Sequence, residues 1–143
     1  MAKDSLDFGL LPELVGYELR RAHTRLFQHF AGSVGRDGIT PGLFGVLVLI
    51  EANPGLNQSR LSEALGIDRS TVVGVIDRLQ ERALVRRAPS ATDRRAYALE
   101  LTEKGHEALA RLKEEVRAHE ADITGGLDAN EQAQLVALLR RLA

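Results

Sequence analysis

The side chains best suited to chemistry in this sequence are arginines and hydroxyls gathered in one short stretch. Arg69, Ser70 and Thr71 open a predicted helix, where backbone N–H groups and the positive end of the helix dipole also point outward. Phosphate oxygens and base edges are natural partners for such a set. The alternative is that Ser70 and Thr71 are ordinary first-turn residues, and these three positions alone do not decide between the two interpretations.

A second group of arginines lies in a predicted hairpin. Arg86 and Arg87 lead into the hairpin, and Asp93, Arg94 and Arg95 lie at its end. An arginine on a hairpin tip suits the DNA minor groove, whose negative potential attracts it, and Asp93 can accept a hydrogen bond from a neighbouring arginine and fix the turn. The alternative is a solvated charged turn, which fits poorly so soon after a helix-turn-helix.

The histidines do not form a metal-binding pattern. His23 and His29 lie six residues apart, on different faces of a predicted helix, while His106 and His119 are isolated in the sequence. The chain has no cysteine, no Gly-x-Ser-x-Gly elbow and no phosphate-binding loop sequence. We therefore expect a protein that is not an enzyme and that needs no metal or cofactor.

A helix-turn-helix is predicted to position the first group of side chains. Helices over residues 58–65 and 68–82 are joined at Gly66, where a tight turn needs a positive φ. Such a turn makes the helices cross steeply, so that the second can enter a major groove about 12 Å wide. The facing apolar stripes are Leu61, Ala64 and Leu65 on the first helix and Val72, Ile76 and Leu79 on the second.

The remaining elements complete a fold that is mainly α with a small β-hairpin wing. Apolar periodicity and capping residues predict further helices over residues 10–30, 41–52, 103–123 and 129–142. The periodicity changes to that of strands over residues 84–87 and 97–101, and Tyr97, Leu99 and Leu101 are expected on one face. The predicted order is four helices, a hairpin and two helices.

The composition is compatible with a DNA-binding protein but does not by itself indicate one. Of 143 residues, 44% are apolar and 4% aromatic, and the net charge is −1. Residues 57–97 hold eight arginines against five acidic residues, which leaves −4 for the rest of the chain, although a solvated surface would also explain this asymmetry. No signal peptide or bilayer-spanning run is recognised, so we expect a cytoplasmic protein without a membrane partner.

Several motifs between residues 61 and 105 resemble the MarR family of bacterial regulators. The matching stretches are Leu61-Ser62-Glu63-Ala64-Leu65-Gly66-Ile67, Ser70-Thr71-Val72, Asp77-Arg78-Leu79, Leu84-Val85-Arg86-Arg87, Asp93-Arg94-Arg95-Ala96 and Leu101-Thr102-Glu103-Lys104-Gly105. The resemblance implies a homodimer that binds double-stranded DNA. Residues 1–35 and 103–143 would form a helical dimerisation region, and residues 36–102 a winged helix-turn-helix DNA-binding domain.

The resemblance also implies roles for individual residues at the DNA. Ser70 and Thr71 would read the major groove, and Arg94 would enter the minor groove. Val73 and Gly74 depart from the polar or basic residues usual there; Val73 could touch a thymine methyl, and the usual phosphate contact from position 74 is not expected. The full expected set is Arg69, Ser70, Thr71, Val73, Arg78, Arg86, Arg87, Asp93, Arg94 and Arg95.

A small-molecule effector is a further implication of the resemblance. The protein would be a repressor released from a palindromic operator by an aromatic acid or its coenzyme A thioester. Residues expected to face an effector crevice are Tyr17, Arg20, His23, Phe27 and Phe44, for which core packing or plain surface exposure is the alternative. The absence of cysteine argues against peroxide sensing. Two other functions stay open: a DNA-binding regulator without an effector, and a helical protein-interaction module.

Overall fold

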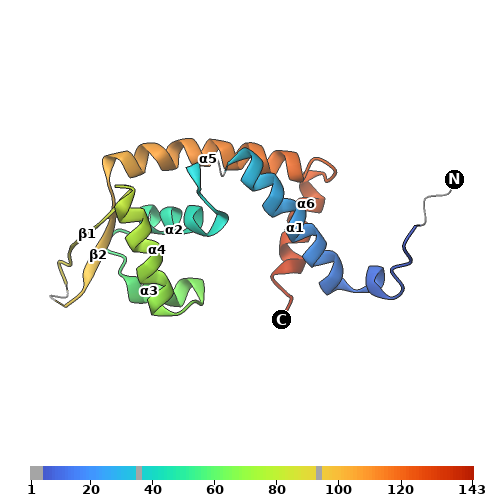
Figure 1. Ribbon diagram of the computed structural model, residues 1–143, viewed down its shortest axis with the longest axis horizontal. Coiled ribbons are helices and arrows are strands. Elements are labelled where there is room, and N and C mark those ends of the chain that lie inside the picture. The colour runs from blue at the N-terminus through green and yellow to red at the C-terminus, as the bar shows by residue number, and fades with distance from the viewer. Residues whose placement is uncertain (1–4, 35–36, 93–94) are drawn as a thin grey trace.

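The computed structural model describes residues 5–34, 37–92 and 95–143. A long helix, α5 (Glu103–Ile123), runs across the molecule and joins two parts (Figure 1). The part at the start of α5, called the lobe, consists of α2 (Pro41–Ala52), α3 (Gln58–Leu65), α4 (Arg69–Glu81), β1 (Val85–Pro89) and β2 (Tyr97–Leu101). The other part, called the helical region, consists of η1 (Leu11–Glu13), α1 (Val15–Ser33), α5 itself and α6 (Ala129–Leu139). The expected class, mainly α with a β-hairpin wing, is confirmed.

Side-chain caps set the starts of α2 to α6, as the sequence predicts, whereas α1 has none. The side chains of Asn57 and Asp68 accept hydrogen bonds from the first turns of α3 and α4. Asp128 and Glu131 form a reciprocal capping box at the start of α6. Helix α3 ends at Gly66, whose φ of 64° is a left-handed conformation that favours glycine, so the tight turn before α4 forms at this residue.

The lobe has a continuous buried core. Leu61 of α3 and Ile76 and Leu79 of α4 are each 0% exposed where the two helices cross. Leu47 of α2 and Leu109 of α5 are also 0% exposed and belong to the same cluster. The helix-turn-helix is therefore supported from behind by α2 and by the first half of α5.

The hairpin is attached to this core along its base. Strands β1 and β2 are antiparallel, with Val85 opposite Leu101, and both side chains are buried. The Leu99 N–H donates to the Leu56 carbonyl at 2.7 Å, which joins β2 to the segment that precedes α3. The wing is thus positioned relative to the helix-turn-helix by backbone hydrogen bonds as well as by apolar packing.

Helix α5 starts directly against the base of the wing. The Thr102 hydroxyl accepts from the Gly105 N–H at 2.9 Å and donates to the Ala83 carbonyl at 2.6 Å. A Cβ at Gly105 would lie 2.0 Å from the Leu84 carbonyl oxygen, so only glycine permits this approach. The helix that leads to the helical region is therefore joined rigidly to the lobe.

The helical region buries far fewer side chains than the lobe. Phe30 is the one buried residue of α1, and α6 has none within the described ranges. Many large apolar side chains are instead exposed, including Leu11, Leu14, Val15 and Leu19 near the N-terminus and Leu135, Val136, Leu138, Leu139 and Leu142 near the C-terminus. In the described chain no helix is both long and apolar enough to cross a membrane.

Element boundaries differ from expectation at several places: α1 continues to Ser33, β1 covers Val85–Pro89, and two further differences lie near the ends of the chain. The helix predicted over residues 10–30 is interrupted, because Leu14 is extended (φ −94°, ψ 123°); a 3-10 turn precedes it and α1 begins at Val15. Helix α6 ends at Leu139, three residues before its predicted end. Both differences lie at chain ends, where few tertiary contacts hold a helix in place.

Three residues predicted to be apolar contacts are instead exposed. Ala64 and Leu65 lie at the edge of the α3–α4 contact, and Leu65 is 36% exposed. Tyr97 is 59% exposed although Leu99 and Leu101 are buried, because it lies at the end of β2 away from the core. The predicted stripes are therefore correct near the centre of the lobe and wrong at its periphery.

Candidate nucleic-acid interface and ligand crevice

The carboxylate of Asp68 organises the first turn of α4. It accepts the backbone N–H of Thr71 at 3.0 Å, the Thr71 hydroxyl at 2.7 Å and the hydroxyl of Ser70. Hydrogen bonds, first from Ser70 and then from Thr71, lower the pKa of Asp68 to about 2. Asp68 is therefore ionised at neutral pH, and both hydroxyls direct their protons to it while their remaining lone pairs stay exposed.

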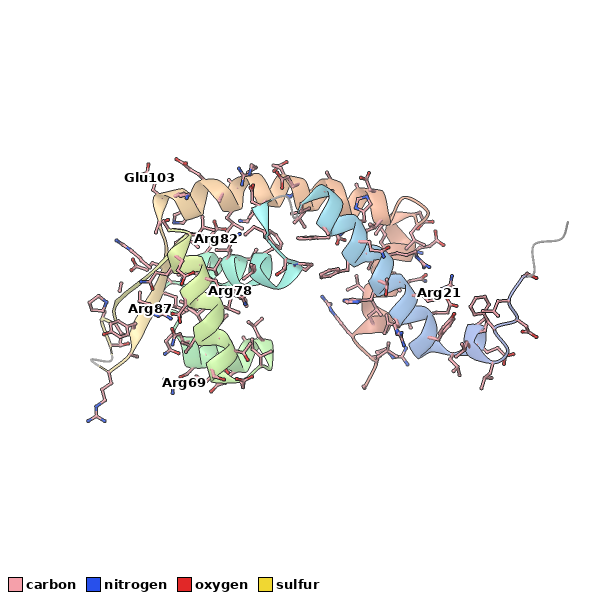
Figure 2. The ribbon with its side chains drawn as sticks, viewed as in Figure 1. Arg21, Arg69, Arg78, Arg82, Arg87 and Glu103 are labelled. Carbon is pink, nitrogen blue, oxygen red and sulfur yellow. The ribbon has the colours of Figure 1, made fainter. Side chains whose placement is uncertain are left out.

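The exposed residues of α4 include two arginines and, between them, a glycine. Arg69 and Arg78 are exposed, and within the described chain neither guanidinium has a hydrogen bond or ion pair (Figure 2). Gly74 is exposed, and a Cβ there would meet nothing within 4 Å, whereas Val73 is half-buried. Arg69 and Arg78 lie about two and a half turns apart and therefore on different sides of α4, so they can offer positive charges to phosphates on either side of the smooth surface at Gly74.

Arg87 has its guanidinium occupied inside the lobe. Its Nε donates to Gln58 Oε1 at 2.8 Å, while its two terminal nitrogens donate to Gln80 Oε1 and Asp77 Oδ1, each at 2.7 Å. One side chain of β1 thus links α3 and α4, and it is only 21% exposed. The expected contact of Arg87 with DNA stays a prediction, and its visible role is to fix the wing against the helix-turn-helix.

The other wing residues fall into two groups. Arg86 forms an ion pair with Glu100 across the hairpin, with Nη2 2.6 Å from the carboxylate, and its side chain remains 67% exposed. Arg95 is exposed near the hairpin end. Asp93 and Arg94 lie outside the described residues, so the minor-groove role expected of Arg94 stays a prediction from the sequence.

A crevice of about 310 Å³ lies where α1, α2 and α5 meet. It brings together three of the five residues expected to face an effector: His23, Phe27 and Phe44. The rings of His23 and Phe27 lie 6.4 Å apart between centroids. Phe30 and His119 also line the crevice, and neither was predicted; the fold alone brings His119 of α5 to α1.

Tyr17 and Arg20 do not line this crevice. Both lie on the part of α1 that precedes His23. The guanidinium carbon of Arg21 lies over the Tyr17 ring, 5.7 Å from the ring centroid. The spacing of residues 17, 20, 23 and 27 nevertheless places them along one side of the helix, with Tyr17 and Arg20 beyond the crevice. Their expected contact with an effector stays a prediction.

The geometry defines a class of protein. An exposed second helix in a helix-turn-helix, flanked by an arginine-bearing hairpin, is the arrangement of a winged helix-turn-helix DNA-binding protein. A profile of the MarR family matches residues 37–96. A transcriptional regulatory protein assigned to the hcr operon of Thauera aromatica is 42% identical over 129 residues, which are 90% of this chain and 78% of the relative. The chain belongs to the MarR family of DNA-binding transcriptional regulators, which are not enzymes.

Solved structures of family members match almost the whole chain. The transcriptional repressor CouR bound to a 23-mer DNA duplex is 40% identical, with a TM-score of 0.90 over 96% of this chain and 97% of that one. CouR bound to p-coumaroyl-CoA is 39% identical, with a TM-score of 0.85 over 95% and 96% of the two chains. The PcaV regulator from Streptomyces coelicolor, in complex with its natural ligand, is 29% identical, with a TM-score of 0.84 over 97% and 96%.

Proposed function

We propose that this protein is a homodimeric transcriptional repressor that leaves a palindromic operator when an aromatic acid or its coenzyme A thioester binds it. The observation that carries the proposal is the position of the crevice. Helices α1 and α5 of the helical region form two of its walls and α2 of the lobe forms the third. A ligand held there contacts both parts of the molecule, and so it can change the position of one relative to the other.

The proposed dimerisation region comprises residues 1–35 and 103–143, and residues 36–102 form the proposed DNA-binding domain. The exposed apolar side chains of η1, α1 and α6 support this division, because exposed apolar patches of this kind mark interaction sites. A two-fold dimer would present two α4 helices to DNA. Those helices must match half-sites about 34–36 Å apart, so a small change in their spacing releases the operator.

The chemistry of the crevice supports an aromatic effector. Phe27, Phe30 and Phe44 supply rings that can contact an aryl group. CouR, whose whole fold matches this chain, is known in complex with p-coumaroyl-CoA. The cavity volume of about 310 Å³ is near the lower limit of about 300 Å³ for ligand pockets. This volume suits an aryl group inside the crevice, with the coenzyme A portion outside it.

A mobility-shift assay on the region upstream of the protein's own gene tests the proposal, with p-coumaroyl-CoA and a panel of phenolic acids as added ligands. We expect binding that weakens with salt, and release of the duplex by at least one member of the panel. Thermal shifts with the same ligands give an independent measure of binding. A complex unaffected by every ligand, together with no thermal shift, would indicate a regulator that acts without such an effector.

Arg94→Ala tests the wing in the same assay. Loss of an arginine from the minor groove should weaken binding by about 10-fold or more. Arg117→Ala is the matched control, because Arg117 is an exposed arginine in the second half of α5, whereas the lobe lies at the start of that helix. Equal affinities for Arg94→Ala and the native protein would remove the wing tip from the mechanism.

A further inference from the structure

A buried imidazole lines the proposed effector crevice. His119 of α5 is 5% exposed, and it is the one buried polar or charged residue in the described chain. Its Nδ1 has a hydrogen-bond partner, whereas no described residue is bonded to its Nε2. No fully enclosed side-chain nitrogen or oxygen of the described residues lacks a partner, so Nε2 keeps some accessible surface, and His119 lines the crevice.

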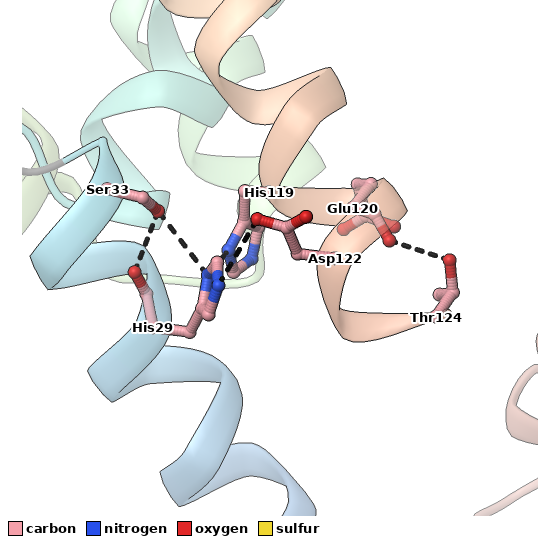
Figure 3. A network of polar contacts seen from close by, with 6 residues as sticks. All are labelled: His29, Ser33, His119, Glu120, Asp122 and Thr124. Carbon is pink, nitrogen blue, oxygen red and sulfur yellow. Dashed lines mark hydrogen bonds and ion pairs between the residues drawn. The ribbon is translucent and has the colours of Figure 1, made fainter. Parts of the chain in front are cut away.

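His119 is the inner end of a relay that reaches the surface (Figure 3). Its Nδ1 lies 2.8 Å from Nδ1 of His29 on α1, and Nε2 of His29 lies 3.5 Å from the carboxylate of Asp122. The edge of the Phe30 ring packs against the His119 ring, with centroids 5.3 Å apart. The imidazole is therefore held by two neighbouring residues of α1, which restrict its freedom to turn.

Asp122 sets the direction of the hydrogen bonds in this relay. A carboxylate only accepts, so it favours a proton on Nε2 of His29 and leaves Nδ1 of a neutral His29 as an acceptor. The Ser33 hydroxyl, which donates to the His29 carbonyl at 2.7 Å, lies 3.4 Å from the same Nδ1 and can share its proton with it. His119 must then donate from Nδ1, since two acceptors cannot bond to each other. A neutral His119 consequently presents Nε2 to the crevice as a hydrogen-bond acceptor.

The crevice also lacks a permanent positive charge. Its described lining contains no lysine or arginine, and its one carboxylate is that of Glu120. Burial, and then the proximity of His29, lower the pKa of His119, so this ring stays neutral at ordinary pH. A carboxylate placed here would lose water without gaining a cation, whereas a neutral hydroxyl could donate to His119.

We propose that His119 accepts a hydrogen bond from a phenolic hydroxyl of the effector, and that the effector's acyl group enters as a neutral thioester or ester rather than as a free acid. This inference rests on the proposed function and specifies the ligand of the same crevice. Asp122 and His29 act through His119 as positioning residues. The relay thereby distinguishes hydroxylated from unsubstituted aromatic rings.

Calorimetric titration of the full-length protein with p-coumaroyl-CoA and with cinnamoyl-CoA, which lacks the ring hydroxyl, tests the first half of the inference. The native protein should bind p-coumaroyl-CoA about 10-fold more tightly, as expected for one added hydrogen bond. His119→Phe should still bind cinnamoyl-CoA and should lose the preference. His106→Phe is the matched control. His106 is exposed on the first turns of α5, so this variant should keep the preference for p-coumaroyl-CoA.

Asp122→Asn keeps the inference testable if His119→Phe does not fold. The Asp122 side chain is 68% exposed, so the variant should remain folded, and the preference should fall because an amide no longer fixes the direction of the relay. Equal affinities of the native protein for the two thioesters would overturn the inference, as would a full preference in Asp122→Asn. If neither thioester binds or releases the operator, it is the proposed function that fails.

A second titration, with methyl p-coumarate and free p-coumarate, isolates the charge of the acyl group. Both ligands carry the hydroxyl and neither carries coenzyme A. The ester should bind at least about 10-fold more tightly than the acid, because the crevice offers no cation to the carboxylate. Tighter binding of the free acid would contradict the second half of the inference.

Discussion

The lobe and the helical region differ in how much of their apolar surface they bury. The lobe encloses Leu47, Leu61, Ile76 and Leu79 completely, whereas α6 has no buried residue in the described chain. The lobe is therefore complete within one chain. The helical region exposes leucines and valines, which a second copy would cover in the proposed dimer. We therefore propose that the lobe binds DNA and that the helical region holds two such lobes together.

The same division explains where polar side chains are placed. In the lobe, Arg87 joins three partners on α3 and α4, and Asp68 holds the hydroxyls at the start of α4. These contacts preorganise the surface that we propose to face DNA. The relay from His119 to Asp122 lies instead between α1 and α5, where the two parts of the molecule meet and where a ligand can affect both.

The largest effect should come from placing a charge in the exposed apolar face of α6. Leu138→Asp would bury two carboxylates in each dimer, and the dimer dissociation constant should rise by about 100-fold or more. Sedimentation velocity over a range of concentrations measures it. Leu65→Asp is the matched control on the lobe. Leu65 is 36% exposed, so this variant should sediment as a dimer like the native protein. A stable dimer of Leu138→Asp would place the interface elsewhere.

A cavity in the core of the lobe should cost stability rather than assembly. Ile76→Ala should lower the free energy of unfolding by about 2–5 kcal/mol, because Ile76 is 0% exposed and its neighbours cannot close the space fully. Urea unfolding at fixed protein concentration checks this value. The folded variant should remain dimeric in sedimentation; dissociation without loss of stability would break the proposed separation of the two parts.

Removal of the Arg87 contacts should have a smaller effect that is confined to the lobe. Arg87→Ala should destabilise the protein by about 1–3 kcal/mol, because three charge-assisted hydrogen bonds are lost from a side chain that is 21% exposed. Arg86→Ala is the control, since its ion pair with Glu100 is largely exposed and should contribute little. If urea unfolding gives equal losses of unfolding free energy in the two variants, the Arg87 contacts with α3 and α4 do not stabilise the lobe specifically.

The smallest effect should be a gain. Gly74→Ala should raise the free energy of unfolding by about 1 kcal/mol, because alanine favours the helix and its Cβ would meet nothing within 4 Å. Operator affinity should fall if DNA approaches the smooth face of α4 closely. Combined urea and mobility-shift data separate the two quantities, and a gain in stability with unchanged affinity would show that no close approach occurs at this position.

The sequence predicted the parts of the structure that depend on local signals. Capping residues such as Asn57 and Asp68 and the glycine at position 66 located α3 and α4, because their effects act within a few residues. Leu14, which interrupts the first helix, was missed because an extended residue after a short 3-10 turn leaves no distinct pattern. Leu65 was misplaced because helical periodicity does not tell the centre of a contact from its edge.

The candidate sites were predictable to different degrees. Arginines and hydroxyls close together in the sequence predicted a DNA-facing surface, which stays a prediction, and aromatic residues of α1 and α2 identified part of the crevice. The pairing of His29 with His119 could not be predicted, because 90 residues separate them and only the packing of α1 against α5 brings them together. The internal partners of Arg87 were hidden for the same reason.

Native mass spectrometry of the protein with a duplex from the upstream region of its own gene tests the central claim most directly. If the lobe reads DNA and the helical region assembles two such lobes, the bound species should contain two chains and one duplex, and complexes with a single chain should be absent at low excess of protein. A complex of one chain with one duplex, formed with undiminished affinity, would contradict the account.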